Sequence, residues 1–207
     1  AELIYTYCDA VRPLRAAELA PTFSEYSAAA AHFGAQIVRH FLRAPEFQPN
    51  AGLLLFLQEQ RPDVLFLCTP NNPTGRTLPR ELLEQVLDLC CGVGTRVPLD
   101  ECFLDFTDAP SAAGLLEQYP NLLILKAFTK NYALAGVRVG YVLTADTALL
   151  SKVAACSQPW NVSIPAQAAA MAALRETQWP VRAKALLAQE RADLMQKLEA
   201  IGCTVCP

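Results

Sequence analysis

Short apolar runs alternate with helix-like stretches through the first two thirds of this chain of 207 residues. Strands are predicted over residues 15–19, 35–41, 62–70, 97–100 and 122–125, and helices over residues 1–10, 22–33, 51–60, 79–91 and 112–118. A strand that leads through a helix into another strand makes a crossover connection, so the two strands run parallel. The alternation therefore predicts an α/β fold, a three-layer sandwich in which helices cover both faces of a mostly parallel mixed sheet.

The pattern changes to helices after Tyr141, with predicted helices over residues 146–156, 165–176 and 181–202. We expect residues 1–180 to form one large domain, and residues 181–207 to form a connector helix followed by the start of a small C-terminal domain. Residues 203–207 resemble the opening of a strand, and residues 1–10 begin inside a helix without a cap. Both ends are therefore expected to be cut. Near the start, Thr22 and Glu25 have the spacing of a helix capping box.

Composition excludes several classes of protein. A net charge of −3 without a long basic block argues against nucleic acid as a partner. Apolar runs such as Leu53 to Leu57 are far too short to cross a bilayer, and the chain does not open on a signal peptide, so we expect a cytoplasmic protein without a membrane partner. The eight cysteines are scattered among apolar residues and there are only two histidines, so no metal site is expected.

Polar side chains stand at the ends of three predicted strands. Asn72 follows one strand, Asp100 ends the next, and Lys130 follows a third. Ligands of open α/β sheets lie beyond the carboxyl ends of the strands, so an amide, a carboxylate and an amine are expected in one crevice. Each residue has a simpler interpretation, because Asn72 occupies a common turn position, Asp100 can bond a neighbouring loop and Lys130 can be solvated. The coincidence of all three favours a shared site.

Lys130 lies in a Gly/Ala-rich turn ahead of Arg138, between apolar runs that predict a strand, a turn and a strand. A lysine among apolar neighbours at the end of a strand is expected to be partly desolvated, which disfavours its charged form and makes it a candidate for Schiff-base chemistry. The fork-shaped guanidinium of Arg138 suits a phosphate group. Taken alone, this stretch also fits a surface lysine and a surface ion-pair partner.

Three segments together resemble a known family. The segment from Asn71 to Gly75 reads NNPTG, the segment from Leu99 to Glu101 reads LDE, and Thr129-Lys130 is followed by Arg138. In this order and at this spacing they resemble the signatures of the pyridoxal-phosphate enzymes of the aspartate-aminotransferase fold, over essentially the whole chain. The resemblance implies that residues 1–180 are the large, cofactor-binding domain of that fold, that the cofactor is pyridoxal 5'-phosphate, and that the full-length protein is a homodimer.

The resemblance assigns four residues to the cofactor ring. Lys130 would bind the cofactor aldehyde covalently, and Asp100 would pair with the pyridine nitrogen and keep it protonated, which makes the ring an electron sink. Asn72 would donate a hydrogen bond to the phenolic oxygen. Phe23 would stack on the face of the ring. Lys130 and Asp100 are the catalytic residues in this assignment.

Four further residues are assigned to the cofactor phosphate. Arg138 and Thr129 would hold it through the guanidinium and the hydroxyl. Ala1 and Glu2 would lie on the helix side of the glycine-rich phosphate loop, which in the family comes just before the position of Ala1. The arginines that bind the substrate carboxylate belong to a C-terminal domain in the family.

Within the family, the chain resembles a branch that contains histidinol-phosphate aminotransferases and L-threonine-O-3-phosphate decarboxylases. Aminotransferases of this branch usually carry a tyrosine where this chain has Phe103, and a serine or threonine where it has Ala127. We take Phe103 as a pointer to the decarboxylase, which converts L-threonine O-3-phosphate to (R)-1-aminopropan-2-ol phosphate in cobalamin biosynthesis. A histidinol-phosphate-type aminotransferase and a fragment without activity are the alternatives.

Overall fold

The computed structural model describes residues 1–205 and contains a six-stranded sheet with the order β2-β1-β3-β4-β5-β6. Its strands are β1 (Arg15–Ala20), β2 (Gln36–Phe41), β3 (Val64–Cys68), β4 (Val97–Asp100), β5 (Leu122–Ala127) and β6 (Gly140–Thr144). Strands β1 to β5 are parallel to their neighbours, and β6 is antiparallel to β5. The predicted α/β fold with a mostly parallel mixed sheet is confirmed.

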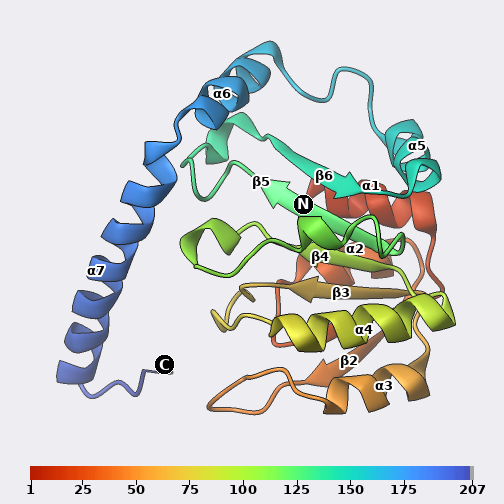
Figure 1. The fold of residues 1–207 in the computed structure, drawn as a ribbon, viewed down its shortest axis with the longest axis horizontal. Coiled ribbons are helices and arrows are strands. Elements are labelled where there is room, and N and C mark those ends of the chain that lie inside the picture. Colours follow the sequence, from red (N-terminus) through yellow and green to blue (C-terminus); the bar gives the residue numbers. More distant parts are fainter. Residues whose placement is uncertain (206–207) are drawn as a thin grey trace.

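Helices cover both faces of the sheet (Figure 1). They are α1 (Glu2–Val11), α2 (Glu25–His32), α3 (Gly52–Gln60), α4 (Arg80–Val93), α5 (Thr147–Cys156), α6 (Ile164–Arg175) and α7 (Gln178–Ala200). Successive residues of β3 point to opposite faces of the sheet. Leu65 packs with α3 and α4, whereas Phe66 packs with α1, α2 and α5. Both faces of the central strands are thus buried, which explains why these strands read as continuous apolar runs.

The hairpin of β5 and β6 depends on a glycine. Gly140 pairs with Ala127, and a Cβ at position 140 would lie 2.8 Å from the carbonyl oxygen of Lys126. Any side chain there would push β6 away from β5. Gly140 therefore closes the loop that carries Lys130 and Arg138 by allowing β6 to pair with β5 directly after it.

Two local predictions are wrong. The Thr22 hydroxyl donates to Oδ1 of Asn71 at 2.7 Å instead of capping α2, so the capping box does not form. Residues 112–118 form a short 3₁₀ turn at Ala112–Leu115 rather than an α-helix, and the turn is held by the Ser111 side chain. At Thr22 a contact with a distant residue replaces the predicted cap, whereas at residues 112–115 the neighbouring Ser111 side chain accepts a hydrogen bond from the Ala113 N–H.

Helices α6 and α7 leave the sheet on the side to which the carboxyl ends of the parallel strands point (Figure 1). The Trp179 indole, in the first turn of α7, donates to the carbonyl oxygen of Asn131 at 2.6 Å. Residues 203–205 have no regular structure, and the rest of the strand predicted over residues 203–207 lies outside the described residues. No helix within residues 1–205 combines the length and the apolar character that crossing a bilayer requires.

Candidate active site

A cavity of about 360 Å³ lies at the carboxyl ends of β3, β4 and β5. All of the residues predicted for the site line it: Ala1, Glu2, Phe23, Asn72, Asp100, Thr129, Lys130 and Arg138. They come from α1, from the loop before α2, and from the segments at or after the ends of the three strands. The structure therefore brings together the amide, the carboxylate and the amine that the sequence places at separate strand ends, as expected for an open parallel sheet.

The Asp100 carboxylate is held by two donors. Oδ2 accepts a hydrogen bond from the Tyr26 hydroxyl at 2.7 Å, and Oδ1 accepts one from the backbone N–H of Cys102 at 2.8 Å. Asp100 is 7% exposed, so only a small part of it faces the cavity. Burial, and secondarily the charge of Asp100, raises the pKa of Tyr26, which keeps the phenol protonated and able to donate. The carboxylate is thus fixed in one orientation before any ligand binds.

Replacing Tyr26 with phenylalanine tests this orientation. We expect cofactor affinity to fall by about tenfold, because a hydrogen bond to a charged group contributes about 1.5 to 3 kcal/mol and about 1.4 kcal/mol corresponds to a factor of ten. Tyr7→Phe is the matched control, since the Tyr7 hydroxyl is buried on the same face of the sheet without a hydrogen-bond partner among the described residues. Titration with pyridoxal phosphate measures both. Equal affinities in the two variants would exclude an effect of Tyr26 on Asp100.

The two asparagines of the NNPTG segment differ in their contacts. The side chain of Asn71 is buried, with Nδ2 donating to the Pro21 carbonyl and to the Thr74 hydroxyl, each at 2.9 Å. Asn71 therefore ties the segment after β3 to the segment after β1. The side chain of Asn72 lines the cavity instead. Only Asn72 is placed to contact a ligand.

Lys130 is exposed, so the partial desolvation predicted for it is not observed. Its Nζ lies 5.3 Å from the centroid of the Phe103 ring, and both residues line the cavity. The expectation failed because the turn after β5 opens toward solvent, whereas the apolar neighbours in the sequence point elsewhere: Phe128 packs against α6. The amine is held near an aromatic face and is accessible to a ligand.

Arg138 is also exposed and adopts a left-handed backbone conformation with φ of 56°. Its Nη1 donates to the carbonyl oxygen of Ala135 at 2.7 Å, which leaves other donors of the guanidinium fork available. Thr129 is half-buried and lines the same cavity. The N-terminal turn of α1, with Ala1 and Glu2, lines the cavity as well. A hydroxyl and a guanidinium in one cavity suit an anionic group.

Sequence reasoning missed several residues around the cavity. Tyr26 lies in the first turn of α2, three residues after Phe23, and the two rings contact each other with centroids 5.6 Å apart. Lys126 is the one charged residue of the otherwise apolar strand β5, and such a residue in a buried strand indicates that its charge has a partner. Cys68 and Cys102 both line the cavity beside Asp100, and burial raises the pKa of both thiols, that of Cys68 to about 12. These thiols are therefore protonated at neutral pH and are poor nucleophiles.

The strand order and the cavity at the strand ends define an α/β protein with the aminotransferase fold. The structure superposes on the histidinol-phosphate aminotransferase from Clostridium acetobutylicum with a TM-score of 0.88 and 27% identity, covering 97% of this chain and 60% of that one. The chain belongs to the family of class I and II aminotransferases, whose model matches residues 14–207. Proteins of this family are pyridoxal-phosphate enzymes.

Two curated relatives are similar to this chain over most of its length. The threonine-phosphate decarboxylase of Salmonella typhimurium is 34% identical over 200 residues, which are 95% of this chain and 54% of that protein. The histidinol-phosphate aminotransferase of Nocardia farcinica is 38% identical over 152 residues, which are 73% of this chain and 38% of that protein. The chain therefore spans about half the length of the curated relatives it matches, or less. The resemblance seen in the sequence motifs is confirmed.

The side chains of the cavity fit pyridoxal phosphate. An accessible amine can bind an aldehyde, a carboxylate fixed by two hydrogen bonds can pair with a ring nitrogen, and a half-buried phenylalanine, Phe23, can cover an aromatic face. Arg138 and Thr129 offer donors for a phosphate. The role of each residue toward the cofactor stays a prediction.

Proposed function

We propose that the full-length protein is a pyridoxal-phosphate-dependent decarboxylase that converts L-threonine O-3-phosphate to (R)-1-aminopropan-2-ol phosphate, a reaction of cobalamin biosynthesis. One observation carries the choice of reaction: the similarity to threonine-phosphate decarboxylase extends over 95% of the chain, whereas that to the histidinol-phosphate aminotransferase of Nocardia farcinica extends over 73%. Phe103 supports it, because a phenylalanine at this position lacks the hydroxyl that the aminotransferases of the branch usually carry.

The chain's own residues would hold the cofactor at both ends. Lys130 Nζ would attach to the aldehyde carbon, and the Asp100 carboxylate would accept a hydrogen bond from the protonated ring nitrogen. The Asn72 amide would donate to the phenolic oxygen, and Phe23 would cover the ring. When bound, pyridoxal phosphate supplies an electron sink for the electron pair of the bond that breaks at the substrate α-carbon. The carboxylate of Asp100 would stabilise the positive charge that this sink requires.

In a decarboxylation, the bond between the α-carbon and the carboxylate breaks, carbon dioxide leaves, and a proton takes its place. Lys130 Nζ is the group of the cavity that we propose to deliver this proton, because an amine that lines the cavity and is accessible would be able to carry a proton to the substrate α-carbon. The ring of Phe103, 5.3 Å from Nζ, adds an apolar wall beside this amine. An aminotransferase would use the same cavity to break the bond to the α-hydrogen instead.

A histidinol-phosphate-type aminotransferase is the second candidate, and it is favoured by the higher identity of 38% to the Nocardia farcinica enzyme over the matched residues. Incubating the full-length protein with L-threonine O-3-phosphate separates the two. We expect carbon dioxide to be released without a keto-acid acceptor. Turnover that depends on 2-oxoglutarate would instead establish the aminotransferase. Carbon dioxide release and amino-group transfer are therefore measured in parallel.

We propose in addition that residues 1–180 are the cofactor-binding domain and that α7 connects it to a small C-terminal domain in the longer protein. The full-length protein is proposed to act as a cytoplasmic homodimer. The Trp179 indole, which donates to the Asn131 carbonyl, supports this proposal because it attaches the start of α7 to the loop that carries Lys130. Sedimentation of the full-length protein would determine its oligomeric state.

A further inference from the structure

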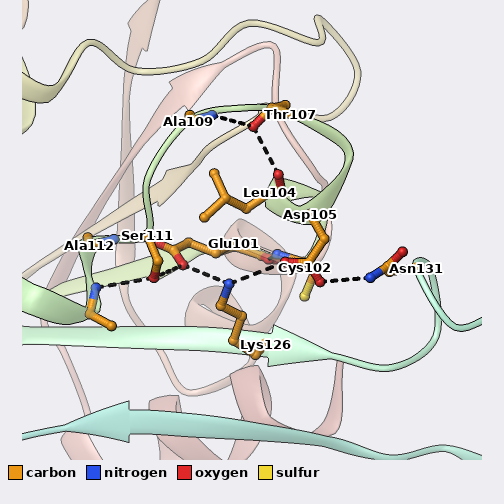
Figure 2. A network of polar contacts seen from close by, with 12 residues as sticks. Glu101, Cys102, Leu104, Asp105, Thr107, Ala109, Ser111, Ala112, Lys126 and Asn131 are labelled. Carbon is orange, nitrogen blue, oxygen red and sulfur yellow. Dashed lines mark hydrogen bonds and ion pairs between the residues drawn. The ribbon is translucent and has the colours of Figure 1, made fainter. Parts of the chain in front are cut away.

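A buried acid lies next to Asp100 on the side away from the cavity. The Glu101 side chain is 1% exposed, and its carboxylate joins three segments (Figure 2). Oε2 accepts a hydrogen bond from the Ser111 hydroxyl at 2.6 Å and pairs with Lys126 Nζ at 3.0 Å, while Oε1 accepts from the backbone N–H of Ala112 at 2.7 Å. Glu101 thus ties the end of β4 to the 3₁₀ turn at 112–115 and to the end of β5.

The contacts continue from Lys126 toward the loop that carries Lys130. Lys126 Nζ lies 3.9 Å from Oδ1 of Asp105, and Oδ2 of Asp105 accepts a hydrogen bond from Nδ2 of Asn131 at 3.1 Å (Figure 2). Asn131 is 2% exposed and directly follows Lys130. A chain of four side chains, which we call the strand-end network (Glu101, Lys126, Asp105 and Asn131), therefore links the residue after Asp100 to the residue after Lys130.

Burial distinguishes the central ion pair of this network from the exposed ion pairs of the described residues. Lys126 is 14% exposed and Glu101 1%, whereas the pair of Lys197 and Asp193 on α7 is largely exposed. Exposed pairs contribute little to structure because water and salt screen them. Removing one partner of a buried pair leaves an uncompensated charge, so the surrounding segments must move or take up water. Here the segments that would move carry Asp100 and Lys130.

We infer that Glu101 and Lys126 are positioning residues that fix the separation between the Asp100 carboxylate and the Lys130 amine. The inference rests on the proposed function, in which a rigid ring is bound at its nitrogen by Asp100 and at its aldehyde carbon by Lys130. A rigid ligand held at two ends requires both groups at the correct distance, because a displacement of about 1 Å can reduce a rate by roughly 100-fold. Glu101 and Asp105 do not line the cavity, whereas Lys126 reaches it, so the two carboxylates hold Lys126 and its strand from behind the site.

Three variants test the inference in the full-length protein: Lys126→Met removes the charge, Lys126→Arg retains it, and Glu101→Gln removes its partner. Attachment of pyridoxal phosphate to Lys130 is measured by borohydride reduction and peptide mass mapping. We expect Lys126→Met and Glu101→Gln to slow attachment by on the order of 10-fold to 100-fold, and Lys126→Arg to restore most of the rate. Lys197→Met is the matched control and should attach the cofactor at the native rate, because its ion pair is exposed.

A second measurement is independent of the cofactor. Backbone hydrogen exchange of residues 128–134 in the cofactor-free protein should be faster in Lys126→Met and in Glu101→Gln than in the native protein, and unchanged in Lys197→Met. Faster exchange with native attachment rates would mean that the network supports the fold alone, and would overturn the positioning role. Slow attachment in both variants at position 126, with a native rate in Glu101→Gln, would show that Lys126 contacts the ligand directly, and would overturn it too.

The outcome for the native protein separates this inference from the proposed function. A native protein that attaches no cofactor at Lys130 refutes the proposed function, and the positioning role falls with it. A native protein that attaches cofactor, with unchanged rates in Lys126→Met and Glu101→Gln, refutes the positioning role alone.

Discussion

Replacing Lys130 with alanine is expected to abolish covalent attachment of pyridoxal phosphate and to reduce turnover by at least about 10²- to 10⁴-fold. A positioned acid or base usually contributes a factor of about 10² to 10⁴ to the rate, and the loss of the covalent bond reduces turnover further. The native protein mixed with pyridoxal phosphate should show a visible absorbance band of lysine-bound cofactor, and the variant should lack it. Borohydride reduction followed by mass mapping should locate the cofactor on the peptide that contains Lys130.

Lys152→Ala provides the control for this experiment, because Lys152 is an exposed lysine of α5 and does not line the cavity. It should retain the absorbance band and native turnover. A band that persists in Lys130→Ala would remove Lys130 from its proposed role. Mass mapping would then identify the lysine that carries the cofactor, and Lys126, which also lines the cavity, is the first alternative.

Replacing Asp100 with asparagine is expected to have the second largest effect. The variant keeps the size of the side chain and an oxygen that can accept from Tyr26, but it removes the charge beside the proposed ring nitrogen. A hydrogen bond to a charged group contributes about 1.5 to 3 kcal/mol, so cofactor affinity should fall by roughly 10- to 100-fold. Turnover should fall further, since the electron sink depends on a protonated ring nitrogen.

Cofactor titration and initial rates at saturating cofactor separate the two effects of Asp100→Asn. Asp193→Asn is the control, because Asp193 forms an exposed ion pair on α7 and should change neither quantity. Native turnover in Asp100→Asn at saturating cofactor would contradict the proposed pairing of Asp100 with the ring. Weak binding that more cofactor fully compensates would show that the residue contributes to affinity alone.

The sequence allowed the sheet and the main site residues to be predicted for a shared physical reason. Continuous apolar runs indicate strands buried on both faces, and parallel strands end at the same edge of a sheet. Asn72, Asp100 and Lys130 therefore had to lie near one another once the strands were recognised. The family motifs added the remaining residues, such as Phe23 and Arg138, which no periodicity identifies.

Contacts between distant residues could not be predicted in the same way. Tyr26 is separated from Asp100 by 74 positions, and a tyrosine on a helix carries no sign of its partner. Thr22 had a local capping site available and instead bonds to Asn71, because α2 begins later than its polar residues indicate. The exposure of Lys130 was also predicted wrongly, since apolar neighbours in sequence do not enclose a side chain at the tip of a turn.

The separation of the core from the strand ends has a consequence for evolution. The side chains that stabilise the sheet, such as Leu65 and Phe66, lie within the strands, whereas Asn72, Phe103 and Lys130 lie in segments that follow them. Substitutions in those segments can alter reactivity at little cost to folding. Lineages with this scaffold can therefore drift between reaction types through a few loop changes while the inherited sheet is preserved.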